Sequence, residues 1–355
     1  MLKFVSTQKL YEEIIRNGIK EKFIIPAFNL RALTFEAGRA LFRAAKKEKV
    51  GVFIIELAKS EIKYTNQPLV RYDNVILRAA QKERFNQPIF LQADHFKIKD
   101  KKEIEDLKIL IKKAIKNSFY NIDLDYSNFS IEDNYTLMAE FTKFIRKIEP
   151  KGLTISIGAE VGEIGGKKTT SNELKKFMEG YKKLLPSNLK GIIKIAVQTG
   201  TSHGLGGKVD FKLLKRLGEE ARKYGLAGVV QHGASMLSEQ EFPKFLKTGV
   251  CEIHLATLFQ DIVYDSKHFP RDLREKIYQW LKKNYIQQRK KEEKEEEFFH
   301  RVRKNALGPF KKEISALPQK NIKKISQEIE EKAVFFFKNF KVSHTAELVK
   351  KIYSK

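Results

Sequence analysis

Short apolar runs alternate with amphipathic segments along the first 265 residues of the chain. Such runs are typical of buried parallel strands, whereas the intervening segments place apolar residues at helical spacing. The predicted strands cover residues 23–29, 52–57, 90–95, 120–125, 155–160, 192–197, 228–231 and 252–256. Strand–helix alternation repeated about eight times over roughly 250 residues predicts an α/β fold, the (β/α)₈ TIM barrel.

The alternation stops at about residue 265, and the rest of the chain reads as helical. We therefore predict a barrel domain over 1–265 and an all-helical C-terminal extension over 266–355. A charge run at about 287–297 indicates a solvated helix or a mobile connector. The cluster Val334–Phe337 with Phe340 is apolar enough to require burial against the barrel or a second subunit.

Reactive side chains stand where several predicted strands end. Asp94 and His95 end the third strand, Glu160 ends the fifth, His203 follows the sixth after a short loop, and His232 follows the seventh. A parallel barrel gathers the C-terminal ends of all its strands at one mouth, so these groups are expected to meet. A doubly wound open sheet is the competing fold, but its sites lie at one switch point rather than at many strand ends.

Composition narrows the functional classes. A chain of 355 residues with 42% hydrophobic content can bury a large core. No apolar run approaches the roughly 20 residues that span a bilayer, and the N-terminus lacks a secretory pattern. The single cysteine, Cys251, excludes an internal disulfide and fits a reducing cytoplasm. We therefore expect a cytoplasmic protein.

The formal net charge of +25 raises the hypothesis of nucleic-acid binding. However, the lysines are spread along nearly every predicted helix and are interleaved with glutamates. This pattern is typical of solvated helix faces, and it disfavours a nucleic-acid partner. A positive field would equally attract an anionic substrate.

Six segments carry a resemblance to a known family. They are residues 25–29 (IPAFN), Asp94–His95, residues 125–134 (DYSNFSIEDN), residues 160–166 (EVGEIGG), residues 200–204 (GTSHG), and residues 229–235 (VVQHGAS) followed by 248–253 (TGVCEI). Together, and in this order, they resemble the class II (metal-dependent) fructose-bisphosphate aldolase family over about residues 1–265.

The resemblance implies a Zn²⁺-dependent lyase of glycolysis and gluconeogenesis that splits fructose 1,6-bisphosphate into dihydroxyacetone phosphate and glyceraldehyde 3-phosphate. Another divalent metal, or an added monovalent cation, is compatible with it. It further implies a homo-oligomer, a dimer or a tetramer. By the matching motifs, the metal ligands are His95, Glu160, His203 and His232, Asp94 is catalytic, and the substrate or its phosphate contacts Asn29, Asp125, Ser127, Gly204, Gly233, Ser235 and Thr257. For Glu160, a supporting role beside the metal remains an equal alternative.

The chain also departs from the family pattern. Lys167 and Lys168 stand where the family carries an acidic pair on its mobile loop, so we assign the catalytic base to Glu163, earlier in that loop. Ala58 replaces a serine of the second strand, and residues 254–257 (HLAT) replace an asparagine-based phosphate motif of which only Thr257 is kept. These changes keep two alternatives open: an aldolase for another sugar phosphate, or a non-catalytic binding or regulatory protein that uses its basic surface.

Lys194, within the sixth strand, raises the question of a Schiff-base mechanism. A strand lysine is more often outward-facing or ion-paired, and the predicted metal ligands make a Schiff base unnecessary. We therefore assign it no catalytic role.

Overall fold

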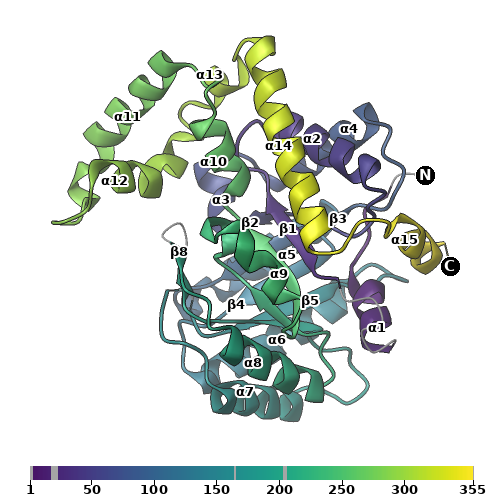
Figure 1. The fold of residues 1–355 in the computed structure, drawn as a ribbon. Helices are drawn as coiled ribbons and strands as arrows, with labels where there is room; N and C mark the ends of the chain where they lie inside the picture. Colours follow the sequence, from purple (N-terminus) through teal and green to yellow (C-terminus); the bar gives the residue numbers. More distant parts are fainter. Residues whose placement is uncertain (1–2, 17–22, 164, 203–205, 355) are drawn as a thin grey trace.

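A computed structural model describes residues 3–16, 23–163, 165–202 and 206–354 of the chain (Figure 1). Its centre is a closed barrel of parallel strands in the order β1-β10-β9-β6-β5-β4-β3-β2. These strands are β1 (Ile25–Asn29), β2 (Ile54–Ala58), β3 (Phe90–Lys97), β4 (Asn121–Asp125), β5 (Ser156–Val161), β6 (Lys194–Val197), β9 (Val229–Gln231) and β10 (Val250–Leu255). Each matches one of the predicted apolar runs, so the TIM barrel is confirmed.

The strands are continuous apolar runs because both of their faces are covered. Every residue of β1, β2, β5, β6, β9 and β10 is buried, with one face toward the barrel interior and the other under helices. The outer helices are α2 (Thr34–Lys47), α3 (Lys59–Tyr64), α4 (Leu69–Lys82), α5 (Ile104–Lys116), α6 (Ile131–Ile148), α7 (Ser171–Leu184), α8 (Phe211–Lys223) and α9 (Phe242–Phe245). Among the described helices, none is both long enough and apolar enough to cross a bilayer.

Shorter elements complete the barrel. A two-strand antiparallel pair, β7 (Thr201–Ser202) and β8 (Gly206–Gly207), follows β6. The 3₁₀ helices are η1 (Lys101–Glu103), η2 (Ala234–Met236), η3 (Glu239–Glu241), η4 (Ile286–Gln288) and η5 (Arg303–Ala306). Near the N-terminus, the helix α1 (Gln8–Arg16) contains the buried Tyr11, whose hydroxyl donates to the Glu252 carboxylate of β10. The first helix therefore reaches into the barrel interior.

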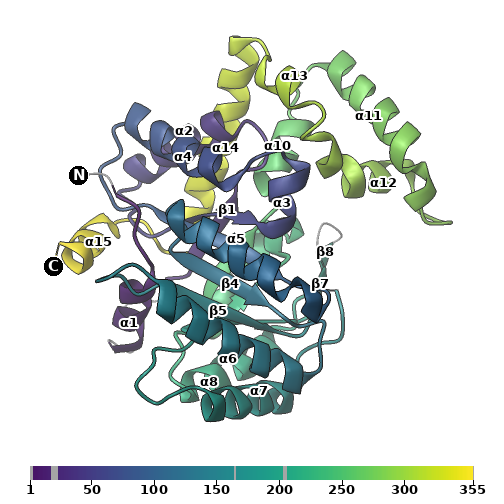
Figure 2. The same ribbon diagram turned by 180° about the vertical axis from the view of Figure 1, so that it is seen from behind.

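The C-terminal region is helical, as predicted: α10 (Leu258–Asp265), α11 (Arg271–Tyr285), α12 (Glu295–Val302), α13 (Lys311–Ser315), α14 (Gln319–Asn339) and α15 (Ala346–Tyr353). Helices α11 and α12 project to one side of the barrel, whereas α14 lies beside α2 in both views (Figures 1 and 2). The charge run at 287–297 is exposed except for the half-buried Glu293, which fits a solvated connector.

The aromatic cluster of α14 is buried against the barrel. The rings of Phe336 and Phe337 lie 6.4 and 6.1 Å from the ring of Phe28 in β1, and Phe340 is also buried. Phe335 remains partly exposed. The predicted need for burial is thus met within the chain. The domain boundary at residue 265 stays a prediction, because apolar residues on both sides of it belong to one hydrophobic core.

Candidate active site

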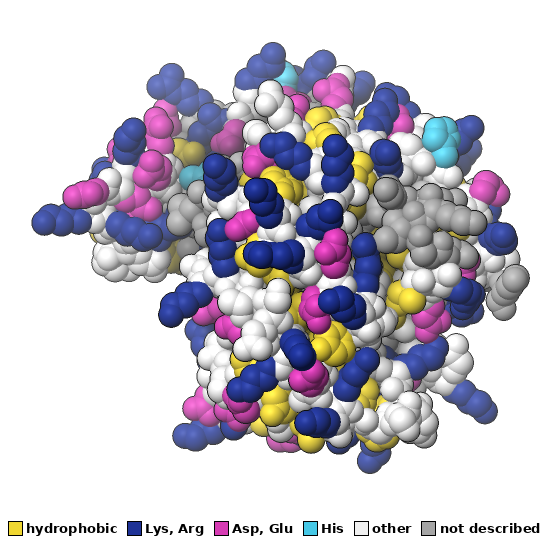
Figure 3. All heavy atoms as spheres, turned by 60° about the horizontal axis from the view of Figure 1, so that its bottom comes forward, with side chains coloured by type: hydrophobic (Ala, Val, Ile, Leu, Met, Phe, Trp, Pro, Cys, Tyr) yellow, Lys and Arg dark blue, Asp and Glu magenta, His cyan; other side chains and the backbone are white. Residues whose placement is uncertain are grey.

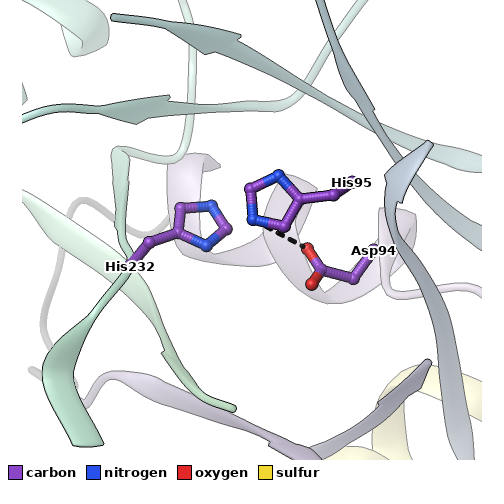
Figure 4. Close-up of side chains that lie close together, drawn as sticks. All are labelled: Asp94, His95 and His232. Atoms are coloured by element: carbon purple, nitrogen blue, oxygen red, sulfur yellow. Dashed lines mark ion pairs between the residues drawn. The ribbon is translucent and has the colours of Figure 1, made fainter. Parts of the chain in front are cut away.

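Strand β3 delivers two consecutive polar side chains to the mouth of the barrel. Neighbouring residues of a regular strand point to opposite faces. Here the register of β3 against β4 shifts between Ala93 and Phe96, and His95 has a φ of 44°. Because this irregularity breaks the alternation, Asp94 and His95 both turn into the same space (Figure 4). A positive φ at a non-glycine residue is strained, and such strain is often found at functional sites.

His232 meets this pair from the other side of the site. It directly follows β9, and its ring centroid lies 4.5 Å from that of His95. His95 Nε2 is 3.9 Å from Asp94 Oδ1, and one ligand atom from each of Asp94, His95 and His232 lies within 4.8 Å of the others (Figure 4). Two imidazoles and a carboxylate at this spacing can hold a metal ion.

The second ring nitrogen of His95 faces two further carboxylates. His95 Nδ1 lies 3.2 Å from Asp125 Oδ2 and 3.2 Å from Glu160 Oε2. Asp125 is fixed in turn, because its other oxygen accepts from the backbone N–H of Ser127 at 3.0 Å and from its hydroxyl at 2.6 Å. His95, Asp125 and Glu160 form a second group that can hold a metal ion.

Burial and crowding shift the pKa of each of these groups. Burial raises the pKa of the Glu160 carboxyl to about 7, and the nearby Asp125 charge adds to the effect. Burial alone would lower the pKa of His95, but Asp94, Glu160 and Asp125 outweigh it and raise that pKa well above its usual value. Burial opposes ionisation of Asp125, yet His95 and Lys97 hold its pKa well below the usual range. The ionised forms of Asp125 and Glu160 therefore require a positively charged group nearby.

A cavity of about 1230 Å³ opens beside His95. Its barrel wall includes Asp125, Glu160 and the exposed Glu163, and its outer wall is built by Tyr285, Asn305, Gly308 and Pro309 of the C-terminal region. The remaining lining includes the lysines Lys59, Lys63, Lys97 and Lys99 among apolar and polar residues. The predicted base Glu163 thus shares a cavity with predicted metal ligands.

The predicted phosphate-binding residues lie near the end of β9 and the start of α10. Gly233 adopts a left-handed conformation with φ of 67°, which glycine tolerates without strain. The Ser235 hydroxyl accepts from the backbone N–H of Thr257 at 3.3 Å. The Thr257 hydroxyl is buried and makes no hydrogen bond within the described part of the chain. His203 and Gly204 lie outside the described residues.

The side chain of Asn29, a predicted substrate contact, is hydrogen-bonded within the protein. It is fully buried, and its amide donates to both carboxylate oxygens of Glu61, at 2.9 and 3.0 Å. Arg31 pairs with the same carboxylate. The role of Asn29 in binding substrate stays a prediction.

A layer of charged residues inside the barrel was not predicted from the sequence as part of the site. It contains Glu56, Asp123, Lys194, Glu252 and His254. His254 stands close to the mouth, with its ring centroid 4.2 Å from that of His232 and its Nδ1 3.3 Å from Asp94 Oδ1. The signal that could have revealed this layer is the presence of charged residues within otherwise apolar strands, because a strand buried on both faces has no solvated side for them.

The family that this arrangement resembles is also found by sequence comparison. The profile of the family described as fructose-bisphosphate aldolase class II matches residues 9–332, nearly the whole chain. The chain belongs to this family. The match extends beyond residue 265 and includes most of α14, which the motifs had not covered.

Solved structures agree on the fold of this class II aldolase family member. Fructose-bisphosphate aldolase from Campylobacter jejuni is 18% identical with a TM-score of 0.62, covering 96% of each chain. The YdjI aldolase from Escherichia coli is 19% identical with a TM-score of 0.54, over 90% of this chain and 99% of that one. A protein from Coccidioides immitis, provisionally assigned as a fructose-1,6-bisphosphate aldolase, is 21% identical with a TM-score of 0.60, over 96% and 99%.

Proposed function

We propose that this protein is a metal-dependent aldolase that cleaves or forms a phosphorylated ketose, with fructose 1,6-bisphosphate as the expected substrate. The observation that carries the proposal is the convergence of Asp94, His95 and His232 at the mouth of the barrel, next to Asp125 and Glu160. An aldolase of the metal-dependent type needs this combination of ligands and a proton carrier.

The donor set fits a divalent cation. Imidazole nitrogen and carboxylate oxygen are ligands that Zn²⁺ accepts, and a catalytic site uses about three protein ligands with one open position. His95 and His232 would hold the metal, and His203 stays the predicted further ligand. Glu160 also stays a predicted ligand, and it lies 3.2 Å from His95 Nδ1, in a group with Asp125 rather than with His232. A bound cation would also satisfy the crowded carboxylates around His95. The metal supplies Lewis-acid stabilisation of charge on the substrate oxygens.

The chain's own groups supply the other requirements. Asp94, buried beside His95, is positioned to hold the proton of the hydroxyl that becomes the aldehyde. Backbone N–H groups near Gly233 and the hydroxyls of Ser235 and Thr257 are suited to one phosphate. The lysines that line the cavity beside His95 favour a second anionic group on the substrate. These features support a bisphosphorylated ketose.

The alternative, a non-catalytic protein that binds nucleic acid through its basic surface, has less support. On the face drawn in Figure 3, Lys and Arg side chains are spread over the surface with Asp and Glu between them, rather than gathered into one patch. Nucleic-acid binding surfaces concentrate positive charge on one face. A buried aspartate beside a metal-type ligand pair also has no evident use in such a protein.

Metal removal tests the proposal directly. Protein treated with EDTA is expected to lose fructose 1,6-bisphosphate cleavage, and added Zn²⁺ to restore it, because the Lewis acid is required. The measurement is cleavage before chelation, after it, and after metal return, with bound metal determined in parallel. Cleavage that is unchanged after all metal has been removed would reject a metal-dependent aldolase. Retention on heparin with salt-dependent elution, in the absence of cleavage, would favour the nucleic-acid alternative.

The loop base is tested by isotope exchange. Glu163→Gln is expected to slow detritiation of labelled dihydroxyacetone phosphate by about 10²-fold, the usual size of a general-base contribution. Glu103→Gln is a matched control, because Glu103 lines the same cavity but pairs with Lys59. If Glu163→Gln exchanges the label as fast as the wild type, Glu163 is not the base. The remaining candidates are then Lys167 and Lys168, of which Lys168 pairs with Asp210 at 3.0 Å.

A further inference from the structure

His254 of the interior layer contacts the aspartate that is predicted to carry the proton. Its side chain is buried, and its Nδ1 lies 3.3 Å from Asp94 Oδ1. The same oxygen of Asp94 is 3.9 Å from His95 Nε2. One carboxylate oxygen of Asp94 therefore lies between an imidazole at the mouth and an imidazole of the layer below it.

The other edge of the His254 ring is fixed by Glu252. Nε2 lies 2.6 Å from Glu252 Oε1, and the same oxygen accepts from Lys194 Nζ at 2.5 Å and from the Gln92 amide at 2.9 Å. An ionised carboxylate only accepts hydrogen bonds, so His254 Nε2 carries a hydrogen and donates it. Because Glu252 is itself held by Lys194 and Gln92, the interior layer sets the orientation of the ring.

Nδ1 of His254 faces Glu56 as well as Asp94. Glu56 Oε2 lies 3.3 Å from Nδ1 and accepts from the Gln92 amide at 3.0 Å. Burial alone would lower the pKa of His254, but Glu56, Asp94 and Glu252 outweigh it and raise that pKa well above its usual value. Burial also raises the pKa of Glu56 well above its usual range, which favours its neutral form. The ring thus has one N–H for Glu252 and another for Asp94.

A proton-carrying aspartate needs a neighbour that fixes its carboxylate. The terminal torsion of an aspartate is broad, so an unsupported carboxylate rotates easily. Proton transfer requires the carboxylate to lie within about 2.6–3.2 Å of the reacting hydroxyl. A displacement of about 1 Å can cost about 10²-fold in rate. His254 can supply the constraint, because its own position is set by Glu252.

We infer that His254 is a positioning residue, which holds the Asp94 carboxylate in the orientation that proton transfer to or from the substrate hydroxyl requires. The inference rests on the proposed function. It also gives a physical meaning to the departure from the asparagine-based motif at residue 254. A histidine spans Glu252 and Asp94 with one N–H at each edge of its ring, whereas an asparagine carries both N–H donors on a single atom.

A double-mutant cycle on the full-length, Zn²⁺-loaded protein tests the inference. His254→Asn is expected to lower kcat for fructose 1,6-bisphosphate cleavage by about 10–10²-fold, with KM and bound Zn²⁺ unchanged. In the Asp94→Asn background the same substitution should lower kcat by less than about twofold, because the group that it positions is already lost. His268→Asn is the control and should keep the kcat of each background, since His268 lies half-buried in the turn between α10 and α11.

An equal loss of kcat in both backgrounds would overturn the inference, because His254 would then act independently of Asp94. A raised KM at unchanged kcat would also overturn it and make His254 a substrate contact, and loss of Zn²⁺ would make it a metal ligand. His254→Gln replaces His254→Asn if the latter fails to fold, as judged by circular dichroism. Failure of both variants to fold would mean that the role of His254 is structural.

A second measurement separates this inference from the proposed function. If the wild type does not cleave fructose 1,6-bisphosphate, the proposed function fails, and thermal unfolding of the same four proteins decides whether His254 supports Asp94. Losses in Tm that are smaller in the double variant than the sum of the single variants would support the contact. Additive losses would reject it. Cleavage by the wild type together with additive losses in both measurements would reject the positioning role alone.

Discussion

Lys194→Met lowers the free energy of unfolding by about 3–5 kcal/mol, the usual cost of removing one partner from a buried ion pair. The Lys194 side chain is fully buried, and its ammonium contacts Gln92, Asp123 and Glu252. Methionine fills a similar volume but leaves the two carboxylates without their cation. Burial and the charge of Glu252 already raise the pKa of Asp123 to about 6 even with Lys194 in place. Thermal and urea unfolding measure the loss.

Lys190→Met is the control, because Lys190 forms an exposed pair with Glu12 on the surface. Such a pair contributes about 0–1 kcal/mol. A loss of stability for Lys194→Met no larger than for Lys190→Met would show that water, not the ammonium, compensates the interior carboxylates.

A Schiff-base role is not available to Lys194, since three oxygens already bind its nitrogen.

The barrel itself was predictable because its physical signal is local. Each strand buried on both faces appears as an apolar run, and each outer helix shows apolar residues at helical spacing, as Ala37, Leu41, Ala44 and Ala45 do in α2. The position of α14 was not predictable in the same way. The apolar character of its aromatic residues predicts that they are buried. It does not predict that they pack against Phe28 of β1, because that contact depends on the tertiary structure.

The site was predictable as far as strand ends are concerned. Asp94 and His95 lie toward the end of β3, Glu160 lies at the end of β5, and His232 directly follows β9, and a barrel brings such positions to one mouth. The local irregularity at His95 was not visible, because a bulge depends on pairing with the neighbouring strand. The layer below the mouth was missed for a related reason: which residues of a strand face the interior depends on the register around the whole barrel.

His254 illustrates this difference. From the sequence, it is only a departure from an asparagine-based motif, and of its partners only Glu252 lies near it in the chain. In the barrel it stands between Glu56 of β2 and Glu252 of its own strand, close to Asp94 of β3. Residues more than 150 positions apart in sequence thus form one buried group, which only tertiary structure assembles.

The buried aspartate at the mouth is expected to have the largest effect on turnover. Asp94→Asn should reduce kcat for fructose 1,6-bisphosphate cleavage by about 10²-fold or more, because the amide keeps the shape of the side chain but cannot take up a proton. The site at the mouth should keep its metal, since the proposed ligands His95 and His232 and the predicted ligand His203 are unchanged. The measurements are kcat and bound metal on the same preparation.

Glu160→Gln provides the contrast that assigns the two roles. If Glu160 binds the metal, its amide variant loses metal and turnover together, whereas Asp94→Asn loses turnover while the metal held by His95 and His232 remains. Glu160 Oε2 lies 3.2 Å from His95 Nδ1, whereas Asp94 Oδ1 lies 3.9 Å from His95 Nε2, so the two substitutions act at different nitrogens of one imidazole. Unchanged kcat in Asp94→Asn would remove Asp94 from proton transfer. Loss of all bound metal in that variant would instead make Asp94 an essential ligand of the ion at the mouth.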